Sequence, residues 1–205
     1  MKHILIVTAV EVERAAVLAG LGQTSSDIDV LTAGVGSAAA AASTAIALTR
    51  ASSLGSPYDM VVCMGIGGAI PGRAAIGDVV VGTASIAADL GAETADGFLS
   101  VDELGFGTSV IATTPIEIGA KIGAILTVST VTGSALRATE LADRHPDALA
   151  EAMEGYGVAC AAAATDTRFV EIRAISNLIG PRDRDAWRIP DALAALAKAA
   201  ATLVE

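Results

Sequence analysis

The amino-acid sequence predicts an α/β fold in which a mostly parallel central sheet is flanked by helices. Short apolar runs alternate along the chain with helical patterns, and that order is typical of parallel sheets. The 205 residues suffice for one sizeable core and are marginal for two. The composition is 53% hydrophobic but only 3% aromatic. The core must therefore consist mainly of small aliphatic side chains, which allow sheet and helices to pack closely.

The first half of the chain predicts strands and helices in turn, from apolar periodicity and from the turn residues between runs. In order they are a strand at Ile4–Thr8, a helix at Glu11–Leu21 ended by Gly22, a strand at 30–34, an Ala-rich helix at 37–50, and strands at 60–65 and 77–85. The run 60–65 (MVVCMG) is almost wholly apolar, so we expect it at the centre of the sheet.

The second half continues the pattern after a Gly- and Thr-rich segment, 91–119, which predicts loop or irregular β structure. The elements are a strand at 124–130, a helix at 134–144, a long helix at 146–164 opened by Pro146 and Asp147, a strand at 169–177 and a final helix with Pro190 in its first turn. No linker or repeat divides the chain, so we expect a single domain over 1–205.

Charge and composition exclude several classes of partner. The net charge of −10 argues against nucleic acid, which needs clustered Lys and Arg. The longest charge-free stretch, 30–49, is too weakly apolar to predict a membrane span. Glu11, Glu13 and Arg14 directly follow the apolar start, where a secretory signal would place small residues. These features indicate a cytoplasmic protein without nucleic-acid or membrane partners.

The titratable residues predict no metal and no cofactor. Cys63 and Cys160 lie in apolar runs without metal-ligand spacing, which is typical of buried reduced thiols. His3 and His145 are isolated. Residues 34–39 (GVGSAA) match a dinucleotide fingerprint weakly, but the acidic residue near the expected distance, Asp59, precedes its strand and could not easily reach a ribose.

Polar side chains gather where the predicted strands end, the place where ligands bind in open α/β sheets. Glu11 and Glu13 follow the first strand, although an acidic first helical turn explains them equally well. Glu154 stands in a mostly apolar helix, and Arg173 in a buried strand. Both need a partner of opposite charge, and a structural ion pair between them is the simplest alternative.

These motifs, in this order, resemble the purine nucleoside phosphorylase and nucleosidase superfamily. The resemblance runs from ILIVTAVEVE through TAGVGSAAAA, VVCMGIGGAIPG, IGDVVVG and AMEG to RAISN, so it covers most of the chain. Within it, TVSTVTGS, HPDALAEAMEG and AISNLIGPRDRDAWRIPDAL are most similar to the futalosine hydrolase family. That family removes hypoxanthine from futalosine in the alternative route to menaquinone. The resemblance implies a three-layer fold around a mixed, mostly parallel sheet.

The resemblance also implies roles for individual residues. Glu13 would act as general base on a water held by Arg173, and Glu154 would bind the ribose hydroxyls, with Met153 beneath the sugar. Further substrate contacts would come from Gly67, Ser176 and Arg182. Arg182 is a candidate for the carboxylate of futalosine, as are Arg184 and Arg188, although a solvated surface loop explains these arginines equally well.

Asn177 stands where adenine-specific relatives carry Asp. An Asn offers one acceptor and one donor, which suit N7–H and O6 of a 6-oxopurine. A carboxylate would instead place a second hydrogen-bond acceptor opposite O6, which is itself an acceptor. Asn177 therefore predicts a 6-oxopurine nucleoside as substrate, and it argues against the enzymatic alternative, a methylthioadenosine or adenosylhomocysteine nucleosidase.

The first loop indicates hydrolysis rather than phosphorolysis. It is acidic, and a phosphate beside Glu13 would be repelled. Cys63 and Ile66, near the glycine-rich turn, offer no charge to a phosphate. The remaining alternatives are a phosphorylase and a nucleoside-binding module without catalysis. The resemblance further implies a homodimer whose second subunit completes the pocket.

Overall fold

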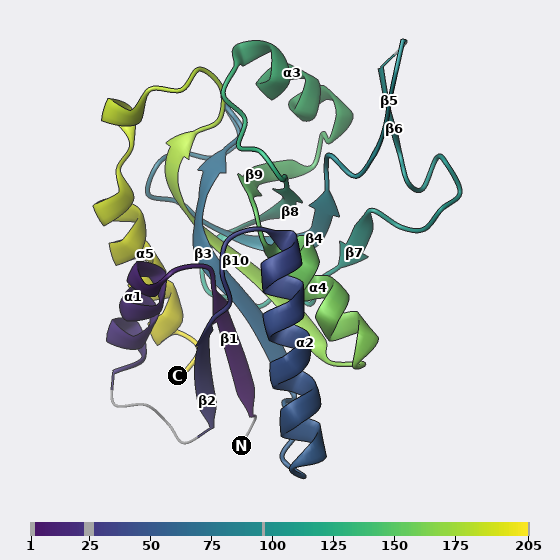
Figure 1. The fold of residues 1–205 in the computed structure, drawn as a ribbon. Helices are drawn as coiled ribbons and strands as arrows, with labels where there is room; N and C mark the ends of the chain where they lie inside the picture. The colour runs from purple at the N-terminus through teal and green to yellow at the C-terminus, as the bar shows by residue number, and fades with distance from the viewer. Residues whose placement is uncertain (1–2, 23–26, 96, 205) are drawn as a thin grey trace.

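An eight-stranded mixed sheet forms the centre of the molecule (Figure 1). The computed structural model describes residues 3–22, 27–95 and 97–204. The strands of this sheet run in the spatial order β10-β4-β8-β9-β3-β1-β2, with β7 on β4. They are β1 (Ile4–Thr8), β2 (Ile28–Thr32), β3 (Met60–Ala69), β4 (Val79–Ala87), β7 (Val110–Ala112), β8 (Lys121–Thr127), β9 (Ala148–Ala152) and β10 (Arg168–Leu178). A separate hairpin consists of β5 (Gly91–Thr94) and β6 (Gly97–Ser100).

The sheet closes on itself because β10 pairs with both β4 and β3. Strands β3, β10, β4, β8 and β9 thus form a ring, from which β1 and β2 extend. Pairs β1–β2, β1–β3, β3–β10, β4–β8 and β8–β9 are parallel, whereas β4–β10, β3–β9 and β4–β7 are antiparallel. The prediction of an α/β fold with a mixed sheet is confirmed. The simpler expectation of an open, mostly parallel sheet is met only in part, because β10 closes a ring by pairing with both β3 and β4, and three of the strand pairs are antiparallel.

Helices cover both faces of the sheet (Figure 1). Helices α1 (Glu11–Leu21) and α5 (Ile189–Ala201) pack on one face, where Val17 and Leu196 join the core. Helices α2 (Ser37–Ser53) and α4 (Gly155–Ala164) cover the other, through Leu48 and Val158. Helix α3 (Ala135–Arg144) packs over the ring, and a short 3-10 helix, η1 (Arg184–Ala186), precedes α5. No described helix meets the length and hydropathy that a membrane crossing requires.

The prediction of one long helix at 146–164 is wrong. Ala148–Ala152 is strand β9, and α4 begins only at Gly155, after Glu154 at its N-cap. Alanine favours helices intrinsically, but this segment inserts between β8 and β3, where Ala148 and Ala150 are fully buried. Tertiary pairing therefore overrides the local preference. As a result Glu154 stands at the junction between β9 and α4 and not within a helix.

Candidate active site

A cavity of about 340 Å³ opens at the carboxyl ends of β3 and β10, beside β9. Its volume lies in the usual range for small-molecule sites, and its wall is mostly apolar with a few polar groups. Of the predicted site residues, those that line it are Glu13, Gly67, Met153, Glu154, Ser176, Asn177 and Arg182. Arg173 is the exception. Its side chain is buried outside the cavity lining and forms an ion pair with Glu154.

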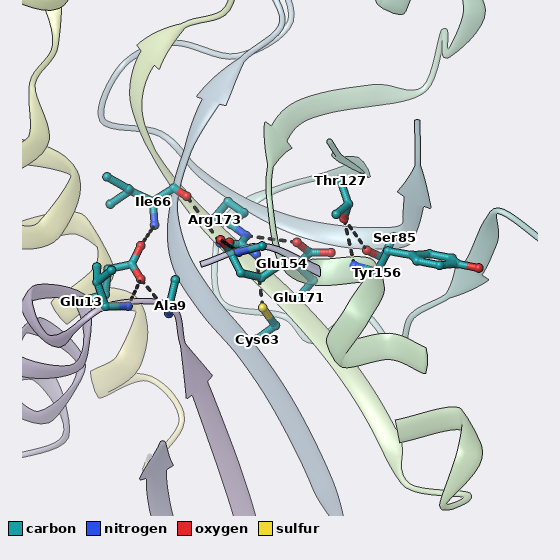
Figure 2. Close-up of polar contacts among 12 residues, drawn as sticks. Ala9, Glu13, Cys63, Ile66, Ser85, Thr127, Glu154, Tyr156, Glu171 and Arg173 are labelled. Atoms are coloured by element: carbon teal, nitrogen blue, oxygen red, sulfur yellow. Dashed lines mark hydrogen bonds and ion pairs between the residues drawn. The ribbon is translucent and has the colours of Figure 1, made fainter. Parts of the chain in front are cut away.

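Glu13 is held rigidly by backbone amides. It lies in the first turn of α1 and is 3% exposed. Its Oε2 accepts hydrogen bonds from the N–H groups of Ala9 (2.9 Å) and Val10 (3.3 Å), and its Oε1 accepts one from Ile66 (2.9 Å) (Figure 2). A carboxylate has about four lone-pair directions. Oε1 thus keeps one free direction for a water or a substrate hydroxyl.

Arg173 and Glu154 form a buried ion pair. Arg173 Nη1 donates to Glu154 Oε2 at 3.2 Å, and the guanidinium is 1% exposed. The other oxygen of Glu154, Oε1, accepts from the N–H of Gly36 at 3.2 Å. The glycine-rich turn that resembles a dinucleotide motif therefore holds a carboxylate of the site. The ion pair expected as a structural alternative exists, and its carboxylate lines the cavity.

Glu171 is a second partner of Arg173 that sequence reasoning missed. Arg173 Nε donates to Glu171 Oε1 at 3.0 Å, so the guanidinium lies between two carboxylates (Figure 2). Burial raises the pKa of the Glu171 carboxyl, and Arg173 only partly offsets it. Within the described residues Glu171 Oε2 has no hydrogen-bond partner. The signal was its spacing, since Glu171 and Arg173 share one face of an otherwise apolar strand.

Gly65 allows Glu13 and Arg173 to approach each other. A Cβ on Gly65 would lie 2.7 Å from Glu13 Oε1 and 2.7 Å from Arg173 Nη1. The two atoms are therefore at most twice that distance apart, with only a glycine between them. Since Arg173 also contacts Glu154, its buried guanidinium lies close to both Glu13 and Glu154, whose carboxylates line the cavity. This is the place expected for the attacking water.

Asn177 projects from a β-bulge, at the point where the register of β10 against β3 shifts between Ile175 and Asn177. Its Oδ1 accepts from Ser176 Oγ at 2.8 Å, and its Nδ2 donates to Leu178 O at 3.0 Å. Ser176, expected to bind substrate, is 2% exposed, and its hydroxyl helps to orient the Asn177 amide. One acceptor direction and one N–H of Asn177 remain for a ligand.

The mouth of the cavity carries a cation and an aromatic ring. Arg182 is exposed and forms no hydrogen bond or ion pair within the part of the chain that the structure describes. Trp187, which sequence reasoning did not select, also lines the cavity, whereas Arg184 and Arg188 do not. Arg188 instead donates to the carbonyl oxygen of Asp185 at 2.9 Å.

Solved structures of nucleosidases share this fold. The 5'-methylthioadenosine/S-adenosylhomocysteine nucleosidase of Neisseria meningitidis, in complex with methylthio-immucillin-A, superposes with a TM-score of 0.81 at 21% identity over 100% of this chain and 99% of that one. The native futalosine hydrolase of Helicobacter pylori gives a TM-score of 0.75 at 17% identity, covering 98% and 94%. These likenesses show that the chain has the fold of these nucleosidases.

Sequence comparison defines the family more narrowly. The chain is 51% identical over 222 residues to the futalosine hydrolase of Streptomyces coelicolor, covering 98% of this chain and 94% of that protein. It is 31% identical to the futalosine hydrolase of Thermus thermophilus, covering 95% and 88%. No protein-family model matches the chain. At these identities and coverages the chain belongs to the futalosine hydrolase family.

Proposed function

We propose that the chain hydrolyses the N-glycosidic bond of futalosine through Glu13, Glu154, Arg173 and Asn177, and releases hypoxanthine. The observation that carries this assignment of residues is the position of the buried Arg173 guanidinium beside Glu13 and Glu154, two carboxylates of the cavity that Asn177 also lines. Membership of the futalosine hydrolase family supports the substrate.

The chemistry requires a water, a base and stabilisation of a ribose cation. As the bond between the anomeric carbon and N9 breaks, its electron pair leaves with the base, and the sugar becomes oxocarbenium-like. Water attacks the anomeric carbon while Glu13 Oε1 takes its proton. Glu154 binds the ribose hydroxyls, with Met153 beneath the sugar, and Arg173 forms an ion pair with the Glu154 carboxylate. Solvent protonates the leaving hypoxanthine at N7, because Asn177 has no acidic proton to give.

Water is a better nucleophile for this site than phosphate. The carboxylates of Glu13, Glu151 and Glu154 line the cavity, whereas Arg182 is the one cationic side chain on the described part of its wall. The charge of Arg173 is already shared between Glu154 and Glu171. A phosphate at the cavity floor would meet net repulsion.

The direct test is turnover in a phosphate-free buffer. We expect the purified protein to release hypoxanthine from futalosine there, at a rate that added phosphate does not increase, as chromatography of the free base will measure. A strict requirement for phosphate would show that the enzyme is a phosphorylase.

Replacing Asn177 by Asp should shift base preference toward 6-aminopurines. A carboxylate and O6 of a 6-oxopurine are both acceptors and cannot form a hydrogen bond, whereas a carboxylate can accept a hydrogen bond from a 6-amino group. Sites built on such hydrogen bonds discriminate by up to about 10⁴-fold. We expect the ratio of kcat/KM for futalosine to that for its 6-amino counterpart to fall at least 10-fold. An unchanged ratio in a folded variant would remove Asn177 from base recognition.

Arg182 is expected to bind the carboxylate of futalosine, whose 5′ side carries a carboxyphenyl ketone, while Trp187 offers an apolar surface to the ring. The Arg182→Met variant should raise KM for futalosine by about 10-fold, the scale of one exposed charge-assisted hydrogen bond, and leave turnover of inosine unchanged. Arg184→Met is the matched control, since Arg184 lies on the same segment but outside the cavity. Equal effects of the two variants would contradict the role of Arg182.

A homodimer and a cytoplasmic location complete the proposal. Val35 (56% exposed) and Val131 (42% exposed) line the cavity yet face outward, so a second copy of the chain could cover its mouth. Cys63 and Cys160 are both free thiols, as in proteins of a reducing compartment.

A further inference from the structure

Glu151 is a buried carboxylate of the cavity with no role in the chemistry above. It lies on β9, lines the cavity and is 3% exposed. Its Oε1 accepts from the N–H of Thr132 at 2.8 Å, and its Oε2 accepts from the hydroxyl of the same residue. No ion pair involves Glu151 among the residues that the structure describes. With two of about four lone-pair directions used, the carboxylate keeps acceptor capacity toward the cavity.

Glu151 and Asn177 flank one glycine in the sheet. Gly68 is paired with Glu151 across β3 and β9, and with Asn177 across β3 and β10. Residues paired directly across neighbouring strands project to the same face. A Cβ on Gly68 would lie 3.1 Å from Asn177 Nδ2, which places the amide on that face. The two backbones thus stand about 10 Å apart, two strand spacings. Between them the side chain of Ile179 packs on Gly68, with its Cγ2 2.7 Å from where that Cβ would lie.

The edge of the purine next to O6 distinguishes the two classes of base. In a 6-oxopurine N1 carries a hydrogen and is a donor, whereas in a 6-aminopurine N1 has a lone pair and is an acceptor. A carboxylate facing N1 attracts the first and repels the second. Burial raises the pKa of the Glu151 carboxyl, and the hydrogen bonds from Thr132 offset this only in part, so a further donor would stabilise the ionised form.

We infer that Glu151 accepts the N1–H of the 6-oxopurine and, together with Asn177 across Gly68, determines which base the enzyme takes. The base lies in the cavity beside Ile179, with N7 and O6 at Asn177 and N1 at Glu151. Two separate contacts then reject a 6-aminopurine, one at position 6 and one at N1. This inference rests on the proposed function, because it requires the base to occupy the cavity that Asn177 lines.

The Glu151→Gln variant tests the inference with little change in shape. Gln can keep a hydrogen bond to Thr132, but it presents an N–H where the carboxylate had only acceptors. We expect the ratio of kcat/KM for futalosine to that for its 6-amino counterpart to fall at least 10-fold. Thr132→Val is the matched control, since it removes a hydrogen bond from the same carboxylate and leaves the acceptor facing the base. If Glu151 only holds Thr132 in place, both variants will lower the two activities equally and the ratio will not move.

A measurement on the unaltered enzyme covers the case in which a variant does not fold. Hypoxanthine should inhibit at least 10-fold more strongly than 1-methylhypoxanthine, in which a methyl group replaces the N1 hydrogen. Equal inhibition by the two bases would overturn the role of Glu151. The proposed function is checked first, by release of hypoxanthine from futalosine. If that release is observed and the ratios stay unchanged, the inference alone fails.

Discussion

Replacing Glu13 by Gln is expected to lower kcat by at least 10²-fold, the scale of a positioned acid–base group. The Gln oxygen can still accept from backbone amides, but the side chain cannot take the proton of the attacking water. Because Glu13 bonds the amides of Ala9, Val10 and Ile66, its position is set by three separate backbone groups. Steady-state release of hypoxanthine from futalosine measures the effect.

Glu11→Gln is the matched control for this variant. Glu11 lies in the same helical turn, but it is exposed and pairs with Arg14 at 3.0 Å, outside the cavity. The Glu11→Gln variant should keep near-normal turnover.

The Glu154→Gln variant should lose as much kcat as Glu13→Gln, since the Glu154 carboxylate binds the ribose. Near-normal kcat in either site variant would show that the residue does not have its assigned role.

Replacing Arg173 by Met should produce the largest loss of stability. Removing one partner of a buried ion pair leaves uncompensated charge and typically costs about 3–5 kcal/mol. Here two buried carboxylates, Glu154 and Glu171, would lose the same partner. We expect the free energy of unfolding, measured by urea denaturation, to fall by about that amount, and hydrolysis to fall below detection.

The double variant Glu171→Gln with Arg173→Met separates stability from function. Glu171 is fully buried, and neutralising it removes the more costly of the two stranded charges. The double variant should recover much of the lost stability but none of the activity, because Glu154 still lacks its cation. A single Arg173→Met variant as stable as the original would contradict the arrangement of charges described above.

Much of the fold followed from local pattern. Strands β1 and β3 and helix α1 were predicted by apolar runs whose ends carry turn residues, and these elements position Glu13. Closure of the sheet could not be predicted, because it depends on β3 and β10 pairing with strands distant in sequence. The strand β9 was predicted as helix because alanines favour helices wherever neighbouring strands do not pair with them.

The site was predictable where a polar residue interrupts an apolar pattern. Arg173, Glu154 and Asn177 stand out in this way. Glu151 does not, because the sequence predicts a helix around it, and that helix gives Glu151 no defined face toward the sheet. Glu171 does not stand out in the sequence, because Glu154 already offers a partner of opposite charge for Arg173. Contacts of this kind depend on the register between strands, which no local window of sequence contains.

Incubation of the purified protein with futalosine and with methylthioadenosine, followed by chromatography of the free base, tests the central claim most directly. If the carboxamide at the end of β10 selects a keto-bearing base, hypoxanthine appears from the first substrate and almost no adenine from the second. Release of adenine without hypoxanthine would contradict the account.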